Sequence, residues 1–528
     1  MSGQMYNLIM ASLPSFYSGD QGEFTIPKDR FLEYTEAAIK GQFQSLDQDA
    51  INKLKNLPTI FAVEDEVADA RIGKITDIKV NSNNLRIKYR FDKDYYPLTR
   101  GLLKEKQQKL DIDDFEFHRG HWAVKKCDIS EFYGEYLKSL AGIAHKLKNT
   151  DKKVQLIYAF NGTGKTRLSR EFKKIIAPKD DGQDAIDDVE PAPLSRHKIL
   201  YYNAFTEDLF YWDNDLDADA EPKLKIQPNT FTDWILKDQG QDQNIITNFQ
   251  RYSSQKLTPR FNAEYKKTNE LGDEIKIIPF SEVTFSLEGG DDQQSNQLKI
   301  SKGEESNFIW SIFHTLLEQV IDILSVQDAA QRESNLFDDL EYVFIDDPVS
   351  SLDENHLIEL AVDLAGLIKR TRPGSIKYIV STHSPLFYNV LHNELKEKAC
   401  YLLQKFDDGS FELKSKEGGA NFSFSYHLYI KQLIEEAIEN NAVQRFHFNL
   451  LRNLYEKAAS FLGYQSWTEL LPEDRTLYAK RVMHFYSHRS LSNEEVAQPT
   501  ASEKQIVDFL LKHLLNNYGF KLQGAQNA

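Results

Sequence analysis

The sequence has 528 residues, 41% of them hydrophobic, and a formal net charge of −16. A chain of this length can bury a large core and is expected to form two to four domains. The acidic balance argues against a protein that coats nucleic acid generally, because the phosphate backbone rewards positive charge. Residues 421–528 carry 11 Lys and Arg against 11 Asp and Glu and hold five of the 13 histidines, so any contact with RNA is expected there.

Cysteine content and hydropathy indicate a cytoplasmic protein. The two cysteines, Cys127 and Cys400, lie far apart without metal-ligand spacing, as is typical of a reducing compartment. The N-terminus has no basic region followed by an apolar one, and the most apolar helix, Phe308–Leu324, is interrupted by a histidine and two acidic residues. We therefore expect neither secretion nor a membrane-spanning segment.

The first 130 residues are predicted to form a helical segment, 1–52, followed by a small β-rich module, 53–130. Turn residues separate short strand-like runs in the module, which predicts two hairpins. The paired runs are Lys74–Val80 with Leu85–Phe91, and Phe115–His118 with His121–Lys125.

The remaining chain is predicted to hold an α/β head with a mixed sheet and flanking helices, 131–420, and an all-α domain, 421–528. A helix over Ile129–Leu147 leads into the head. A helical insertion is expected at about 223–299, between the motifs described next.

A phosphate-binding loop is the strongest signal in the sequence. Val154–Tyr158 is predicted as a buried strand and Arg167–Ile176 as a helix, and the loop between them ends in Gly-Thr-Gly-Lys-Thr. Such glycines let backbone N–H groups close around phosphates, Lys165 neutralises the β and γ oxygens, and Thr166 ligates Mg²⁺. Ala159 replaces the first glycine of the pattern. The residues predicted to bind nucleotide here are Asn161, Gly162, Thr163, Gly164, Lys165, Thr166 and Arg167.

A second buried strand, beginning at Tyr342, ends in two carboxylates. Asp346 is predicted to hold Mg²⁺ together with Thr166, and Asp347 to polarise the attacking water. The two motifs together predict hydrolysis of ATP with Mg²⁺ as cofactor.

With these two motifs, the sequence resembles the ABC ATPase superfamily. Ser301-Lys302-Gly303-Glu304-Glu305 matches its signature loop, Ser351-Leu352-Asp353 its D-loop, and His383 its switch histidine. The resemblance implies that His383 acts in hydrolysis and that the signature loop contacts the γ-phosphate of a second copy, in a head-to-tail dimer. Whether such dimers form a higher oligomer stays open. No glutamine is placed at the Q-loop position. The residues that it implies for nucleotide contact across the dimer are Ser301, Gly303, Glu304 and Asp353.

The run Asp346-Asp347-Pro348-Val349-Ser350-Ser351-Leu352-Asp353 is similar to the subgroup that contains the PrrC-type bacterial anticodon nucleases. In that group a helical nuclease domain follows the head and carries an Arg, a Glu four residues on, and a His downstream. Arg452, Glu456 and His488 fit this pattern. Cleavage of RNA without a metal needs a base, an acid and a cation for the phosphorane charge, and these three side chains can supply them.

Two readings of Arg452 and Glu456 stay open, since residues four apart on a helix also form ordinary solvated ion pairs. The resemblance implies an ATP-gated ribonuclease of anti-phage defence that cleaves tRNA in the anticodon loop. The alternative is an ATPase sensor or scaffold subunit that controls a separately encoded nuclease or other effector, without its own nuclease. An ATPase that handles DNA ends is disfavoured, because such heads carry long coiled coils between the phosphate loop and the signature. Only about 135 residues separate Lys165 from Ser301.

Overall fold

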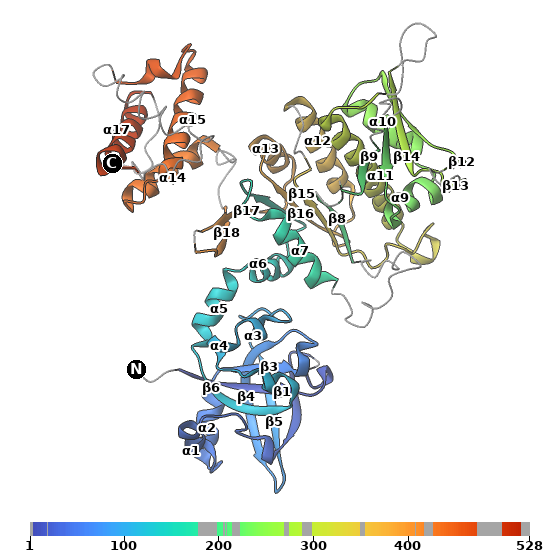
Figure 1. The fold of residues 1–528 in the computed structure, drawn as a ribbon. Helices are drawn as coiled ribbons and strands as arrows, with labels where there is room; N and C mark the ends of the chain where they lie inside the picture. The colour runs from blue at the N-terminus through green and yellow to red at the C-terminus, as the bar shows by residue number, and fades with distance from the viewer. Residues whose placement is uncertain are drawn as a thin grey trace. The chain divides into compact units, whose positions relative to one another are not determined.

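The computed structural model describes residues 4–17, 19–177, 198–203, 206, 208–213, 222–268, 274–287, 298–348, 354–406, 408–416, 426–472 and 499–518 (Figure 1). The chain divides into two compact units, Met1–Glu417 and Gly418–Ala528. The division lies next to residue 421, where the sequence predicts the start of the helical domain.

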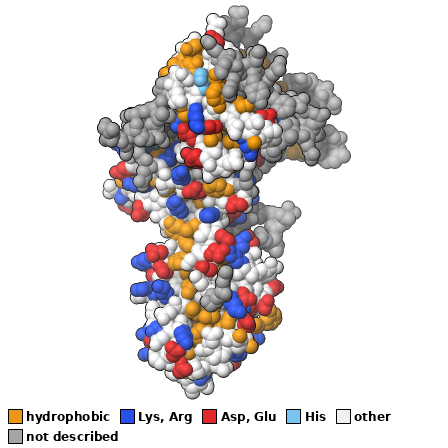
Figure 2. Space-filling view, turned by 90° about the vertical axis from the view of Figure 1, so that its left-hand side faces the viewer, with side chains coloured by type: hydrophobic (Ala, Val, Ile, Leu, Met, Phe, Trp, Pro, Cys, Tyr) orange, Lys and Arg blue, Asp and Glu red, His pale blue; other side chains and the backbone are white. Residues whose placement is uncertain are grey.

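The N-terminal part of the first unit is built on a six-stranded sheet with the strand order β2-β5-β4-β3-β1-β6. Strands β1 and β3 run parallel, and the other neighbours are antiparallel. Figure 2 shows basic and acidic side chains interspersed on one face of this module, a surface that does not suit a polyanion. The strands are β1 Met5–Ala11, β2 Gln21–Pro27, β3 Thr59–Val63, β4 Arg71–Val80, β5 Asn84–Phe91 and β6 His121–Lys126, and the helices are α1 Ala37–Phe43, α2 Gln48–Asn56, α3 Leu102–Glu105 and α4 Gln107–Leu110.

The prediction of a helical segment over residues 1–52 is wrong, because β1 and β2 lie in it and belong to the same sheet as the module. Tyr6, Leu8 and Met10 pack into the core on one face of the sheet, and Ile9 packs into the core on the other. The sequence of a strand that is buried on both faces is a continuous apolar run. It lacks the alternation of apolar and polar residues that identifies a half-exposed strand.

One of the two predicted hairpins is present. Strands β4 and β5 pair around the asparagine-rich turn, with Val80 opposite Leu85. The second hairpin is wrong: Asp114–His118 forms a 3₁₀ helix, and β6 pairs with β1. Asp113 and Glu116 form a capping box, whose reciprocal hydrogen bonds favour a helical turn over a strand.

The helix expected over Ile129–Leu147 is two helices, α5 Ile129–Leu137 and α6 Leu140–Lys148. Ser139 begins α6 by accepting a hydrogen bond from the backbone N–H of Gly142. Side chains of α5 pack into the core of the N-terminal module, and side chains of α6 pack into the core of the head. The joint between α5 and α6 therefore connects the module with the head.

The head has a mixed six-stranded sheet of order β18-β17-β7-β16-β15-β8, in which only β18 is antiparallel to its neighbour. Helices flank the sheet (Figure 1), so the α/β class expected from the motifs is present. The strands are β7 Val154–Tyr158, β8 Ile199–Tyr202, β15 Tyr342–Asp346, β16 Lys377–Thr382, β17 Lys398–Lys405 and β18 Phe411–Ser415, and the helices are α7 Lys165–Ile176, α11 Lys302–Ser325, α12 Glu354–Arg370 and α13 Pro385–Glu394.

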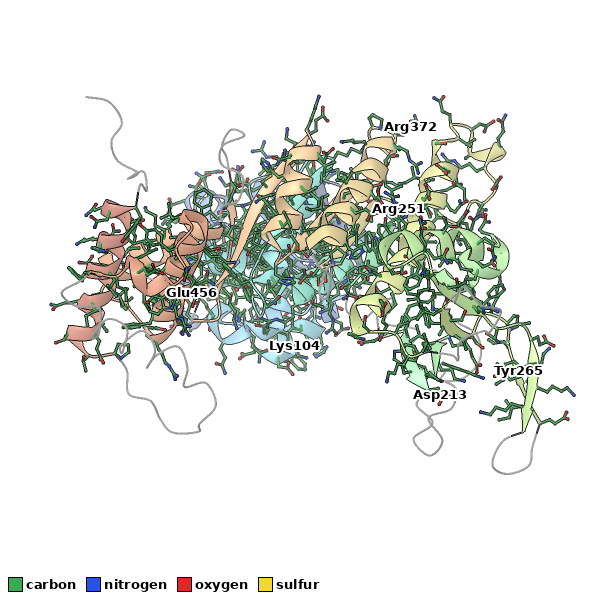
Figure 3. All side chains as sticks on the ribbon, turned by 90° about the horizontal axis from the view of Figure 1, so that it is seen from above. Lys104, Asp213, Arg251, Tyr265, Arg372 and Glu456 are labelled. Carbon is green, nitrogen blue, oxygen red and sulfur yellow. The ribbon has the colours of Figure 1, made fainter. Side chains whose placement is uncertain are left out.

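The insertion expected to be helical at about 223–299 contains both strands and helices, so the helical prediction is only partly right. Its antiparallel sheet has the order β11-β14-β10-β9, and β12 and β13 form a separate two-stranded ribbon, on which Figure 3 labels Tyr265. Aromatic and β-branched residues such as Val283 and Phe285 are fully buried in this sheet, where they pack well on a pleated surface. The elements are β9 Phe210–Asp213, β10 Lys223–Ile226, β11 Leu257–Phe261, β12 Tyr265–Thr268, β13 Glu274–Ile277, β14 Glu282–Leu287, α9 Thr230–Asp233, the π-helical turn Trp234–Asp238 and α10 Asp242–Tyr252.

Helix α11 is, among the described helices, the one long and apolar enough to cross a membrane by length and composition, but 78% of its most apolar stretch is buried inside the protein. It packs against α10 and α12. Arg251 of α10, labelled in Figure 3, links α10 to α12 by donating to Glu359 at 3.0 Å and to Asp363 at 2.7 Å. Helix α11 is thus a core helix of the head.

The second unit is helical throughout its described part. Its core contains Leu451, Tyr455 and Leu511, and the Tyr455 hydroxyl donates to the carbonyl of Leu510 at 2.8 Å. The elements are α14 Tyr426–Glu439, α15 Arg445–Leu462, a 3₁₀ helix Trp467–Leu470 and α17 Ala501–Asn517.

Candidate functional site

The three motif-bearing strands of the head are neighbours. Strands β7, β16 and β15 run parallel, with Ser381 opposite Asp346 and Thr382 opposite Tyr158. Because parallel strands end at one edge of the sheet, the phosphate loop, the paired acids and His383 meet there.

The phosphate loop lies between β7 and α7 as predicted. Gly162 and Gly164 have φ values of +79° and +104°, a region that other residues rarely adopt. The Lys165 ammonium group donates to the carbonyls of Ala159 and Phe160 at 3.2 and 3.3 Å and to Asn161 Oδ1 at 3.2 Å. The three oxygens that accept from it inside the loop are neutral and are weaker partners than a phosphate.

Thr166 and Asp346 supply the oxygen atoms suited to a hard cation. The Thr166 hydroxyl donates to Asp346 Oδ2 at 2.7 Å, and the Ser381 hydroxyl donates to Asp346 Oδ1 at 2.5 Å. Burial raises the pKa of Asp346, against the effect of these two hydrogen bonds. Across the described residues, no group of three or more His, Cys, Asp or Glu is arranged for a metal. One carboxylate and one hydroxyl nevertheless fit Mg²⁺, which fills its other positions with phosphates and water.

Asp347 and His383 form a second pair at the same edge. His383 Nδ1 lies 2.6 Å from both carboxylate oxygens of Asp347, and Lys165 Nζ lies 3.4 Å from Oδ2. Burial opposes ionisation of Asp347, but the hydrogen bond from His383 and the charge of Lys165 lower its pKa overall. Asp347 also has a φ of +54°, and strained backbone of this kind clusters at functional sites.

The signature-like loop is an exposed helix start. Ser301 is the N-cap of α11 and forms a capping box with Glu304, whose carboxylate accepts from the backbone N–H of Ser301 at 2.8 Å. Gly303 lies in the first turn, and Glu305 accepts from Trp212 Nε1 at 2.9 Å. An exposed helix N-terminus can receive an anion from another molecule.

Arg167, in the first turn of α7, contacts the last strand of the head sheet. Its guanidinium lies over the ring of Phe411 in β18, 5.5 Å from the centroid. Thr163 is buried in the phosphate loop.

Asn203, directly after β8, is linked to the site but is not among the residues predicted from the sequence. Asn203 is fully buried and donates to the Tyr201 hydroxyl at 2.7 Å, which lies 2.6 Å from Ser169 Oγ. Ser169 in turn donates to the carbonyl of Thr166 at 2.8 Å, so the chain of donors runs from Asn203 to the first turn of α7. A polar residue directly after a strand next to β15 is the signal that identifies it.

In the second unit, Arg452 and Glu456 lie together on α15. Arg452 Nε donates to Glu456 Oε1 at 2.7 Å, and the guanidinium lies 5.7 Å from the centroid of the Trp467 ring. Side-chain exposures are 20% for Arg452 and 43% for Glu456, so the carboxylate faces solvent more than the cation does. The other two predicted residues, His488 and Asp353, lie outside the described residues.

Comparison with known proteins gives one close relative. The chain is 60% identical over 379 residues to an anticodon nuclease of Escherichia coli, an alignment that covers 71% of this chain and 92% of the relative. No protein-family model matches the sequence.

Among solved structures, an SMC head bound to the C-terminal winged-helix domain of ScpA is 10% identical, with a TM-score of 0.27 over 52% of this chain and 93% of that one. The SMC head domain from Thermotoga maritima is 13% identical, with a TM-score of 0.22 over 50% and 91%. TM-scores this low establish no common fold, so the assignment rests on the sequence relative. The chain belongs to the family of the anticodon nucleases.

Proposed function

We propose that this protein is an ATP-hydrolysing defence protein of bacteria whose helical domain is a ribonuclease that cleaves tRNA in the anticodon loop under control of the head. The 60% identity to an anticodon nuclease over 92% of its length carries the proposal. The geometry at the sheet edge supports the nucleotide part, since the loop, the oxygen ligands and the Asp347–His383 pair lie together.

In the head, Asn161 to Thr166 hold the phosphates and Lys165 exchanges its loop carbonyls for β and γ oxygens. Thr166 and Asp346 would hold Mg²⁺, which would neutralise charge on the phosphates. Asp347 accepts a proton from the attacking water, and His383 keeps its carboxylate in position. Ser301, Gly303, Glu304 and Asp353 contact the nucleotide of a second copy in a head-to-tail dimer.

In the second unit, the Glu456 carboxylate is partly exposed and lies 2.7 Å from Arg452 Nε, so Glu456 is suited to take the 2′-hydroxyl proton. Arg452 stabilises the negative charge of the phosphorane, and His488 protonates the leaving 5′-oxygen. The attack of the 2′-oxygen forms a cyclic phosphate and breaks the bond to the 5′-oxygen, without a metal.

The ion pair predicts a specific test. Purified protein is incubated with total tRNA in the presence of ATP and Mg²⁺, and breaks are located by sequencing fragment ends. We expect discrete anticodon-loop breaks with the wild type and with Glu436→Gln, a solvent-exposed carboxylate on α14. Glu456→Gln should lose them by at least 10²-fold. Breaks that persist in Glu456→Gln contradict the assignment of this residue.

A second candidate function is that of an ATPase subunit controlling a separately encoded effector. The pairing of Arg452 and Glu456 is as consistent with this alternative as with a nuclease, because the same geometry arises in structural ion pairs. Under this alternative the wild-type protein leaves every tRNA intact while still hydrolysing ATP, and a partner protein copurifies with it.

A further inference from the structure

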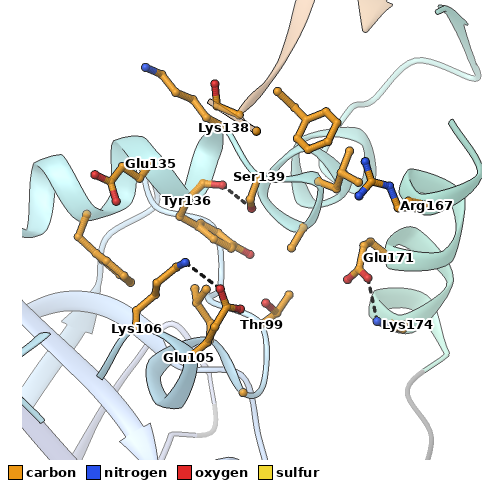
Figure 4. A pocket seen from close by; sticks show the side chains of 18 of the residues that line it. Thr99, Glu105, Lys106, Glu135, Tyr136, Lys138, Ser139, Arg167, Glu171 and Lys174 are labelled. Atoms are coloured by element: carbon orange, nitrogen blue, oxygen red, sulfur yellow. Dashed lines mark hydrogen bonds and ion pairs between the residues drawn. The ribbon is translucent and has the colours of Figure 1, made fainter. Parts of the chain in front are cut away.

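A pocket of about 1070 Å³ lies beside the phosphate loop (Figure 4). Four segments line it: the α3 region of the N-terminal module, the joint between α5 and α6, the outer face of α7, and the turn between β17 and β18. Of the residues predicted to bind nucleotide, Arg167 is the one that lines the pocket. The lining side chains used below are Thr99, Lys138, Arg167, Arg170, Asp408 and Phe411.

The pocket begins where the phosphate loop ends. A Cβ placed on Gly164 would lie 3.3 Å from the Arg167 guanidinium and 3.4 Å from the Phe411 ring. Both side chains therefore border the loop directly, next to the first turn of α7. Lys165 Nζ and Asp347 mark the γ end of a bound triphosphate, and the α7 N-terminus receives its α end.

We propose that this pocket receives the ribose and base of the nucleotide whose phosphates occupy the loop, and that the N-terminal module contacts them through its segment Thr99–Lys106. The inference rests on the proposed nucleotide binding of the head. A nucleoside attached to the α-phosphate must leave the loop at α7, and Arg167 and Phe411 lie there.

The chemistry of the walls suits a nucleoside. The Arg167 guanidinium lies 5.5 Å from the centroid of the Phe411 ring, and a guanidinium and an aromatic ring are both groups on which a base can stack. Lys138 and Arg170 offer donors and Asp408 offers an acceptor to ribose hydroxyls and to the base edge. Pockets of several hundred to about 1000 Å³ are usual for ligands of this size.

The pocket also connects the head with the module. The backbone N–H of Phe411 donates to the carbonyl of Lys138 at 2.7 Å, which fixes β18 to the end of α5. On the other side, the Tyr136 hydroxyl donates to the carbonyl of Pro97 at 2.9 Å, two residues before Thr99. A nucleoside in the pocket therefore touches elements of both parts, and the module distinguishes a nucleotide from a bare polyphosphate.

Hydrogen exchange on the full chain tests this contact. The protein is compared with Mg²⁺ and the β,γ-imido analogue of ATP, with Mg²⁺ and inorganic tripolyphosphate, and without ligand. We expect both ligands to protect the loop peptide at 160–170, and the analogue alone to protect 99–106 and 408–411. Protection at 160–170 without any at 99–106 overturns the proposal. If neither ligand protects 160–170, the proposed nucleotide binding itself fails, and the proposal with it.

A blocking variant gives an independent readout. Thr99→Trp fills the pocket from the module side, whereas Lys104→Trp adds the same side chain at an exposed position of α3 outside the lining. We expect Thr99→Trp to weaken binding of the ATP analogue about tenfold or more, from the lost base stacking, and to leave tripolyphosphate binding unchanged. Equal affinities of both variants for the analogue contradict the proposal.

Discussion

Replacing Asp347 by asparagine is expected to slow ATP hydrolysis by 10²–10⁴-fold without weakening nucleotide binding. The change keeps the size of the side chain but removes the charge that accepts from His383 at 2.6 Å. General-base catalysis contributes about 10²–10⁴ in rate, which corresponds to about 3–5 kcal/mol of activation free energy. Because Asp347 also draws Lys165 at 3.4 Å away from an incoming phosphate, its loss leaves affinity equal or higher.

Single-turnover hydrolysis and equilibrium binding of an ATP analogue separate the two effects. Asp339→Asn, an exposed acid three residues before β15, is the matched control and should behave as the wild type. Hydrolysis by Asp347→Asn within about threefold of the wild type would show that Asp347 is not the base. A parallel loss of binding would assign it to nucleotide affinity instead.

Three further changes test the site and its support. Thr166→Val removes the hydroxyl that lies 2.7 Å from Asp346, and should abolish the Mg²⁺ dependence of nucleotide affinity in a titration, an effect of about 1–3 kcal/mol. Gly142→Ala places a Cβ 2.2 Å from the carbonyl of Tyr136 and should destabilise the first unit by about 1–3 kcal/mol in denaturant unfolding, whereas Gly134→Ala has open space and should stabilise it slightly. Burial lowers the pKa of His145 to about 4, so its contribution to stability is present above pH 6.5 and is lost as the pH falls toward 4. Acidification from pH 7 toward pH 4 should therefore lower the free energy of unfolding of the wild type by about 3 kcal/mol more than that of His145→Phe. The same pH dependence of the unfolding free energy in both proteins would refute this.

The sequence predicts the elements that carry the candidate nucleotide site well, because each motif lies at the end of an element that it also helps to form. The glycines of the phosphate loop, the apolar run before Asp346 and the cap at Ser301 are local signals, and the parallel sheet brings them together. Asn203 is not predicted from the sequence, because a single polar residue after a short strand forms no motif with a recognisable spacing. Its role depends on Tyr201 and Ser169, which are contributed by different elements.

The N-terminal part was predicted less well, because its strands depend on distant partners. Strand β1 pairs with β3 and β6, which follow at residues 59–63 and 121–126, and no local pattern reports such pairing. The strands of the insertion are not predicted for a related reason. Strands β10 and β14 pair across more than fifty residues, with Leu224 opposite Val283. The pocket at Phe411 could not be predicted at all, since its four walls come from segments spread over more than 300 residues.

Expression in bacteria tests whether this chain is itself a nucleotide-controlled tRNA nuclease. The most direct measurement expresses the wild type, Lys165→Ala, His488→Ala and the control His513→Ala in bacteria and maps tRNA ends by sequencing. We expect discrete anticodon-loop ends with the wild type and His513→Ala, and their loss in His488→Ala. The yield of these ends should change in Lys165→Ala, which removes the cation held in the phosphate loop. Ends that persist unchanged in His488→Ala, or tRNA that stays intact with the wild type, would contradict this function.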